Sequence, residues 1–454
     1  MAKTFQTYEP NQYFLMPPRL DEWLPDNHLA YFIGEVVDEL DVREITEVYE
    51  EEERGYPPYH PVMMIKILLY GYCVGIASSR RIARELEEDV AFRVLAAENR
   101  PDFRTISDFR KRHLKPLSRI FLQVLRMCQE AGLVKLGHVG LDGTKVKANA
   151  SKHKAMSYGR MCKAEGELEK EVGELLKKAN EVDAREDELY GPDKRGDELP
   201  KELARRETRL KKIREAKKAL EEEARREAER KRAERAQKEA AYKGRKPPGR
   251  KPKSVGEKPK ERAQYNFTDP DSRIMKGAGT VFLQAYNAQA AVDGKSQVIV
   301  ACDVINNPKD GLVTVKMVDQ VQRNTGRKPK KVLADAGNYS DENVEELRGR
   351  GIDAYITPEK TKHSDRTLPP PRGRIPKDAS TRERMIRKLR TKRGREIYAR
   401  RKVIPEPVFG QIKAARGFDR FLLRGMEKVR GEWALICLGH NLLKLFRSGK
   451  WVPA

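Results

Sequence analysis

The chain has 454 residues, a length that predicts two or three domains. Only 38% of the residues are hydrophobic and 36% are charged, so part of the chain cannot contribute to a hydrophobic core. The formal net charge of +24 favours a polyanionic partner, and nucleic acid is favoured over a membrane because no apolar run approaches the roughly 20 residues of a spanning helix.

Residues 1–134 are predicted to form a helical domain. Residues 28–40 and 61–74 carry apolar residues at helical spacing, and the second segment is apolar nearly all round, which indicates a central helix. Residues 78–95 begin with serine caps and keep one apolar stripe, which predicts a single amphipathic helix. A basic helix over 104–113 follows a turn, and this order is typical of a helix-turn-helix-like DNA-binding domain.

Three arginines of this basic helix are candidate DNA contacts: Arg104, Arg110 and Arg112. The alternative is a plain helical domain whose arginines are solvated or pair with glutamates of the preceding helix. Helix-turn-helix spacing alone is weak evidence, so both interpretations stay open. If the first holds, a fragment of residues 1–134 should fold alone and bind DNA.

Residues 135–155 are predicted to contain a short buried strand with one aspartate, Asp142, inside it. Val139, Leu141 and Val146 supply the apolar residues of this strand. Because an unpaired carboxylate is costly to bury, a cation should offset its charge, and a metal ion is the simplest candidate.

Residues 156–262 form a charged insert. An acidic helix with an apolar stripe is followed by a turn at 191–200 and a second, highly charged helix, which together predict an antiparallel helical hairpin with a thin apolar seam. The basic, proline-rich segment 243–262 has no core residues. It has either the character of a short arm that enters the DNA minor groove or, more simply, that of a disordered tether.

Residues 263–454 are predicted to complete a mixed sheet. Two strands, a helix, a strand, a helix and a strand are expected in turn at 283–292, 297–304, 312–321, 331–334, 342–348 and 352–357. With the Asp142 strand first, the order is β-β-β-α-β-α-β, that of a ribonuclease H-like α/β fold. An apolar helix at 432–446 closes the chain.

A basic arm is expected at 361–402. It holds 16 Lys or Arg residues against four Asp or Glu residues, a net charge of +12. A solvated disordered arm is one interpretation of this composition. A surface that contacts the DNA backbone is favoured, because the charge stands directly before the predicted helix start at 403–413, which carries Glu406.

Three carboxylates in strand, strand and helix contexts are the candidate catalytic and metal-binding residues: Asp142, Asp335 and Glu406. Hard divalent cations such as Mg²⁺ or Mn²⁺ prefer carboxylate oxygens, so these three residues form a set suited to such ions. Lys413 lies seven residues after Glu406, two turns along the same face of a predicted helix. It could hold a flanking DNA phosphate.

The segments GLDGTK at 140–145 and LADAG at 333–337, and the spaced set Tyr398, Arg401, Glu406 and Lys413, resemble the DDE transposases of bacterial insertion sequences. Arg401 stands one residue further from Glu406 than in the commonest form of that signature. The resemblance implies a ribonuclease H-like fold, two magnesium ions, and DNA cleavage followed by strand transfer. It also implies DNA-backbone contacts by Tyr398, Arg401 and Lys413.

The partners expected on this interpretation are double-stranded DNA, namely terminal inverted repeats and target DNA, and a second copy of the chain in a homodimer on DNA. No membrane partner is expected. Five scattered cysteines and an opening segment without an apolar signal core predict a cytoplasmic, nucleoid-associated bacterial protein. The alternatives are a nuclease of the same fold that does not join DNA and a non-catalytic DNA-binding protein derived from a transposase.

Overall fold

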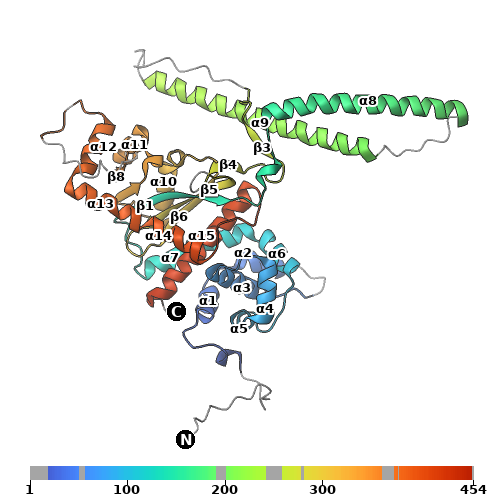
Figure 1. The fold of residues 1–454 in the computed structure, drawn as a ribbon. Coiled ribbons are helices and arrows are strands. Elements are labelled where there is room, and N and C mark those ends of the chain that lie inside the picture. Colours follow the sequence, from blue (N-terminus) through green and yellow to red (C-terminus); the bar gives the residue numbers. More distant parts are fainter. Residues whose placement is uncertain are drawn as a thin grey trace, which may run out of the picture.

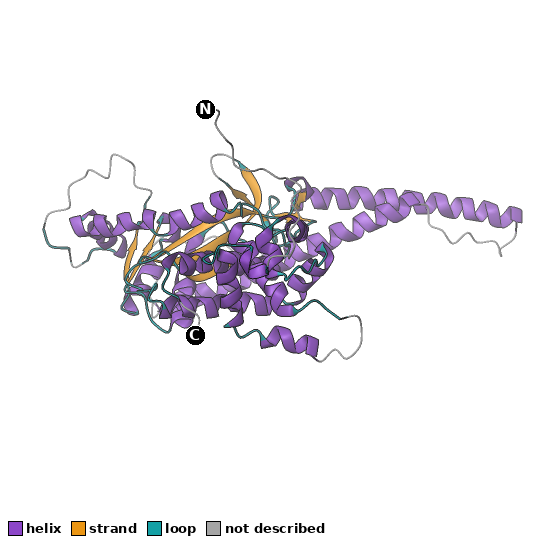
Figure 2. Ribbon diagram, turned by 90° about the horizontal axis from the view of Figure 1, so that it is seen from below, coloured by secondary structure: helices purple, strands orange, loops and turns teal. Residues whose placement is uncertain are grey.

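The computed structural model describes residues 19–50, 57–190, 201–241, 258–277, 281–359, 373–376 and 378–451. Figure 1 shows a group of N-terminal helices, a mixed sheet flanked by helices, and two long helices that project from the body of the molecule. Figure 2 shows the same projection from a second direction. The predicted α/β class with a helical N-terminal region is confirmed.

The N-terminal region consists of short helices around one buried helix. They are α1 (Leu29–Asp38), α2 (Arg43–Glu50), α3 (Pro61–Val74), α4 (Ser79–Glu88), α5 (Val90–Leu95), α6 (Phe103–Arg112) and α7 (Leu114–Glu130). Ten of the 14 residues of α3 are buried, so α3 is the central helix that its apolar sequence predicts. Among the described residues no single helix is long and apolar enough to cross a membrane, although α3 and α4, bent by 98° at their junction, pass that test as a pair.

Residues 78–95 form two helices where the apolar stripe predicts one. Asp89 is extended, with φ −103° and ψ 123°, and it ends α4. Its carboxylate accepts a hydrogen bond of 3.0 Å from the backbone N–H of Phe92 and so caps the start of α5. The prediction of a single helix is therefore wrong here. The apolar stripe continues past Asp89, but Asp89 ends one helix and caps the next.

The sheet has the strand order of a ribonuclease H-like fold. Its strands are β1 (Val139–Lys147), β4 (Arg273–Lys276), β5 (Phe282–Asp293), β6 (Ile299–Ile305), β7 (Lys331–Ala334) and β8 (Asp353–Ile356). The order is β4-β5-β1-β7-β8. The sixth strand, β6, also pairs with β5, so β4 and β6 share this neighbour. β1, β7 and β8 run parallel, whereas β5 is antiparallel to β1. α11 (Asp341–Gly349) joins the parallel strands β7 and β8, as such a pair requires a crossover, and α10 (Thr314–Thr325) leads from β6 to β7.

The insert between β1 and β5 is a helical hairpin with a core of its own. It consists of α8 (Tyr158–Tyr190) and α9 (Lys201–Ala241), and at its base β2 (Ala155–Ser157) pairs with β3 (Gln264–Asn266). The ion pairs Arg206–Glu171 and Arg214–Glu165 join later residues of α9 to earlier residues of α8, so the two helices are antiparallel. Residues 243–257 of the predicted basic linker lie outside the described residues.

The second half of the predicted basic arm is helical. From residue 381 the chain forms α12 (Thr381–Arg390) and α13 (Lys392–Val403), which lie against β7 and β8. Ser380 and Glu383 form a capping box, which fixes the residue at which α12 begins. Residues 361–372 lie outside the described residues. After α13 come α14 (Pro405–Gly410), a π-helical turn at Gln411–Ala415, and α15 (Met426–Ser448).

One hydrophobic core joins the N-terminal helices to the sheet. α15 packs against α3 and α7 on one side and against β6 on the other, and the buried residues of all these elements form a single cluster. Trp433 of α15 is fully buried and donates its indole N–H to the backbone oxygen of Gln289 on β5. This shared core argues against the expectation that residues 1–134 fold alone.

Candidate active site

Asp142 lies in the middle of the sheet, on its central strand β1. Its side chain is 18% exposed, and its Oδ1 accepts a hydrogen bond of 2.8 Å from the backbone N–H of Gly143. Burial, and next the negative charge of Asp335, raise the pKa of Asp142 to about 6. A carboxylate held in this way favours a nearby cation, as the sequence predicts.

Asp335 follows β7 directly and lies beside Asp142 because of the strand register. β1 and β7 are parallel, with Gly140 opposite Leu333, and each aspartate comes two residues later in the chain. Asp335 Oδ1 accepts hydrogen bonds of 2.9 Å from the N–H of Gly337 and from Asn338 Nδ2, which fix its orientation. The two aspartates therefore meet at one edge of the parallel part of the sheet.

Glu406 reaches the same region from α14, which packs directly onto β1. A Cβ atom on Gly140 would lie 2.8 Å from Cδ of Pro405, so only glycine at this position permits the close approach. Pro405 occupies the first turn of α14, where its missing N–H has no cost, and Glu406 follows it. The side chain of Glu406 is 48% exposed.

The guanidinium of Arg401 lies between two of the three carboxylates. Its Nη2 is 3.2 Å from Glu406 Oε1 and its Nη1 is 3.8 Å from Asp142 Oδ2. Among the described residues no three His, Cys, Asp or Glu side chains are placed to hold a metal ion together. The three carboxylates lie on adjoining elements and have the donor type that Mg²⁺ prefers, and the Arg401 guanidinium lies within 4 Å of two of them.

Lys413 is anchored to β1 two and three residues after Asp142. Its ammonium donates hydrogen bonds of 3.0 Å to Thr144 Oγ1 and 2.8 Å to the backbone oxygen of Lys145, and burial lowers its pKa. The predicted single helix from Glu406 to Lys413 is instead α14 followed by the π-helical turn. π-Helical turns are frequent at functional sites, and this one directs Lys413 into the sheet.

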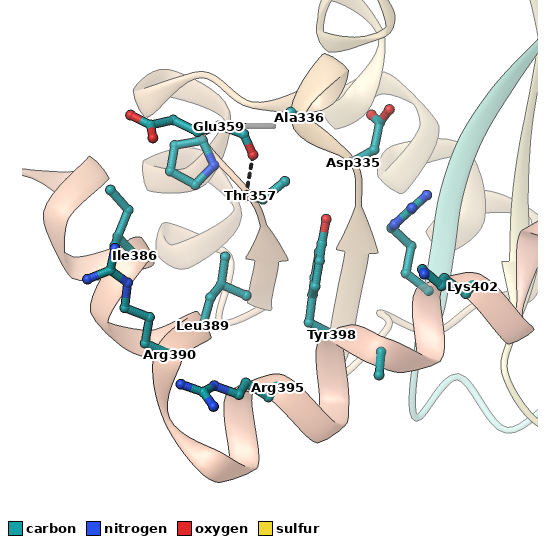
Figure 3. Close-up of a pocket in the computed structure, with 13 residues that line it drawn as sticks. Asp335, Ala336, Thr357, Glu359, Ile386, Leu389, Arg390, Arg395, Tyr398 and Lys402 are labelled. Carbon is teal, nitrogen blue, oxygen red and sulfur yellow. Dashed lines mark hydrogen bonds between the residues drawn. The ribbon is translucent and has the colours of Figure 1, made fainter. Parts of the chain in front are cut away.

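A cavity of about 570 Å³ adjoins the carboxylates, between α12, α13 and the ends of β7 and β8. Its walls include Asp335, Arg401 and the ring of Tyr398, which extends from α13 toward the strand end that carries Asp335 (Figure 3). Apolar side chains form part of its lining, and cationic side chains line it as well: Ile386, Leu389, Arg390, Arg395 and Lys402. Burial raises the pKa of Tyr398, so its hydroxyl stays protonated.

A fourth carboxylate, Asp310, belongs to the site although its sequence context indicates an ordinary turn. Its Oδ1 accepts hydrogen bonds of 2.6 Å from Asn287 Nδ2 and from Gln289 Nε2, both on β5, and lies 3.5 Å from Lys145 Nζ. Its charge contributes to the raised pKa of Asp142. The sequence signal that could have indicated this network is the pair Asn287 and Gln289, two polar residues at alternate positions of the buried strand β5.

The candidate DNA-binding arginines of α6 lie in the helical region, apart from the carboxylates. Arg110 is only 4% exposed and donates a hydrogen bond to the backbone oxygen of Ala77, so its side chain holds α6 against the start of α4. It is not presented to DNA in this structure. Arg104 stacks on Phe103 and Arg112 on Tyr49, with guanidinium carbons 5.7 Å and 5.4 Å from the ring centres.

The strand order and the acidic side chains around its central strand define a ribonuclease H-like protein. Residues 18–112 match the family model described as Transposase domain (DUF772), and residues 253–442 match the one described as Transposase DDE domain. Both matches are to transposase families, and the two together are consistent with a DDE transposase. Asp335 and Glu406 lie inside the second matched range, whereas Asp142 lies between the two. No curated protein and no solved structure matches the chain.

Proposed function

We propose that this chain is the transposase of a bacterial insertion sequence, which cuts DNA at terminal inverted repeats and joins the ends to target DNA. The observation that carries this proposal is the strand register, which sets Asp142 beside Asp335 and leaves Gly140 free to admit the helix of Glu406. We further propose that the protein works in the cytoplasm on the nucleoid, as a homodimer that holds two DNA ends.

Asp142, Asp335 and Glu406 would hold two Mg²⁺ ions, or Mn²⁺ in their place. Bound there, the ions would supply an activated oxygen nucleophile and stabilisation of the leaving 3′ oxygen. The chain's own residues do the positioning: Gly337 and Asn338 orient Asp335, and Gly143 orients Asp142. The half-buried Lys413 ties the π-helical turn to β1 and so fixes α14, which carries Glu406, against the same strand.

The DNA backbone would lie along the cationic rim of the 570 Å³ cavity, with Tyr398 and Arg401 nearest the carboxylates. Arg390 and Lys402 extend that rim on α12 and α13. Positive charge at this place holds phosphates without regard to base sequence. Recognition of the terminal repeats belongs to the N-terminal helices, where Arg104 and Arg112 remain candidates.

The test is a comparison of Asp142→Asn, Asp335→Asn and Glu406→Gln with Glu396→Gln, an exposed acid of α13, on DNA that carries the ends flanking the gene. We expect the first three variants to lose cleavage in Mg²⁺ and to keep DNA binding in a gel-shift assay, while the fourth cleaves normally. Near wild-type cleavage by any of the three removes that residue from the metal site. Adding target plasmid distinguishes a transposase, which yields joined products, from a nuclease, which yields none.

A further inference from the structure

The side chain of Arg401 lies beside Glu406, although one continuous helix through both residues would point their side chains in different directions. It lies five residues before Glu406, and on one continuous helix two such residues would point about 140° apart. The structure breaks the helix between them: α13 ends at Val403, Ile404 has φ −96° and ψ −72°, and α14 starts at Pro405. Because of this break the guanidinium comes within 3.2 Å of the Glu406 carboxylate.

The surroundings of Arg401 are dominated by negative charge. Asp142 is influenced by the charges of both Asp335 and Asp310, and Glu406 stands on the other side of the guanidinium. With only 17% of its side chain exposed, Arg401 is placed as the counter-ion of this carboxylate group. Without the guanidinium, no positive charge would stand between the carboxylates of Asp142 and Glu406 at this place.

The same guanidinium is incompletely satisfied by hydrogen bonds. Its Nε is buried and has no hydrogen-bond partner, and its contact with Asp142 is 3.8 Å long. A buried donor without a partner is costly, so charge attraction rather than a complete hydrogen-bond network holds the side chain in place. Such an arrangement is readily reversed by a competing cation.

Space for the displaced side chain lies directly beside it. Arg401 forms part of the wall of the 570 Å³ cavity, and its guanidinium carbon is already 6.0 Å from the centre of the Tyr398 ring. A change of side-chain rotamer therefore moves the charge into the cavity, against an aromatic face that attracts cations.

From these contacts we propose that Arg401 is a built-in counter-ion that takes the place of the divalent cation between Asp142 and Glu406 and competes with it. The inference rests on the metal site of the proposed function. Arg401 stabilises the carboxylate group while no metal is bound, and it must withdraw toward Tyr398 before the three carboxylates can converge. When the metal binds, Arg401 moves, and the same movement brings its positive charge to the DNA-binding rim of the cavity.

The experiment measures Mn²⁺ binding to the full-length, DNA-free protein by isothermal titration calorimetry, together with thermal unfolding in EDTA. Arg401→Gln should bind Mn²⁺ about tenfold more tightly than the wild type, because one competing charge is gone, and should unfold at a lower temperature in EDTA. Arg401→Lys keeps the charge and should fall between the two. Arg400→Gln, the same change at the exposed neighbouring residue, should match the wild type in both measurements.

The outcomes separate the inference from the proposed function. If the wild type and Arg401→Gln bind Mn²⁺ equally, while Asp335→Asn loses binding, the metal site is supported. The proposed competition between Arg401 and the cation is then wrong. If no variant binds Mn²⁺, the site itself fails and the inference with it. An equal gain in Arg400→Gln would show a general charge effect and would also overturn the proposal. Should Arg401→Gln fail to fold, Arg401→Lys decides alone by its affinity relative to the wild type.

Discussion

Gly140 is the residue that sets the distance between the central strand and the helix that carries Glu406. Its backbone lies against Pro405, where a Cβ atom would be 2.8 Å from Cδ and 3.1 Å from Ile404 Cγ2. Pro405 and Ile404 are not flexible charged side chains that could turn aside. An added methyl group would therefore push α14 away from β1. The residue thus links a local packing contact to the geometry of the site.

Gly140→Ala should lower the free energy of unfolding by about 1–3 kcal/mol, as overpacking commonly does, and should reduce DNA cleavage through displacement of Glu406. Urea unfolding and a cleavage time course measure the two effects. Gly137→Ala is the matched control, because no atom lies within 4 Å of the Cβ position there. Identical behaviour of the two variants would show that α14 does not depend on the close approach.

His440 on α15 makes the protein sensitive to acid. It is buried, its Nε2 donates to the backbone oxygen of Gln297 at 2.9 Å, and burial lowers its pKa to about 3. Because the folded pKa lies below that of the unfolded chain, near 6.5, the stabilisation is complete above pH 6.5 and is lost as the pH falls toward 3.

Between pH 7.5 and pH 5 this one histidine should account for a loss of about 2 kcal/mol in the free energy of unfolding. His440→Gln keeps a donor for Gln297 and cannot titrate. Its free energy of unfolding should therefore change by about 2 kcal/mol less than that of the wild type between these two pH values. Urea titrations at both values provide the measurement, with His153→Gln, an exposed histidine, as control. An unchanged pH dependence in His440→Gln would show that this histidine titrates alike in the folded and unfolded chain.

At the scale of elements, the α8–α9 hairpin is stabilised by a small core separate from the main one. Met161 and Leu168 of α8 meet Leu210, Ile213, Ala216 and Leu220 of α9. Ion pairs with partly exposed partners surround this core, and each adds little on its own. The hairpin can therefore lose its structure without unfolding the rest of the molecule.

Ile213→Ala should weaken the hairpin by about 2–5 kcal/mol, the usual cost of removing a buried branched side chain, and leave the main unfolding transition unchanged. Limited proteolysis should then cut within α8 or α9 first and release a stable remainder. Lys212→Ala changes an exposed residue of the same helix and should leave the cleavage pattern unaltered. Simultaneous loss of both parts in Ile213→Ala would show that the two cores are coupled.

At the scale of the whole molecule, the net charge of +24 predicts DNA binding that weakens steeply with salt. If Arg390 and Lys402 contact phosphates, replacing both with Gln should reduce the slope of log affinity against log salt by about two and weaken binding to all DNA sequences alike. Filter-binding titrations over a range of salt concentrations give the slope. Lys211→Gln with Lys212→Gln on the projecting helix α9 removes the same charge and should leave the slope unchanged (Figure 1). Equal slopes for both pairs would remove the cavity rim from the DNA path.

The sequence by itself predicted five of the six strands of the sheet and named three candidate carboxylates. Apolar runs of the right length predicted β1, β5, β6, β7 and β8, because buried strands leave a strong local signal. It also predicted that Asp142 needs a cation, since the cost of burying a carboxylate follows from its apolar neighbours alone. Both inferences depend on residues close together in the chain.

The tertiary structure alone decided which distant groups meet. Asp310 joins the site only because β5 brings Asn287 and Gln289 beside β1, and Arg110 is buried only because α6 lies against the start of α4. The place of Arg401 depends on a helix break whose effect is visible only once α14 is packed on Gly140. Such contacts are set by the packing of separate elements against one another, and the sequence pattern of one element alone does not specify its partner.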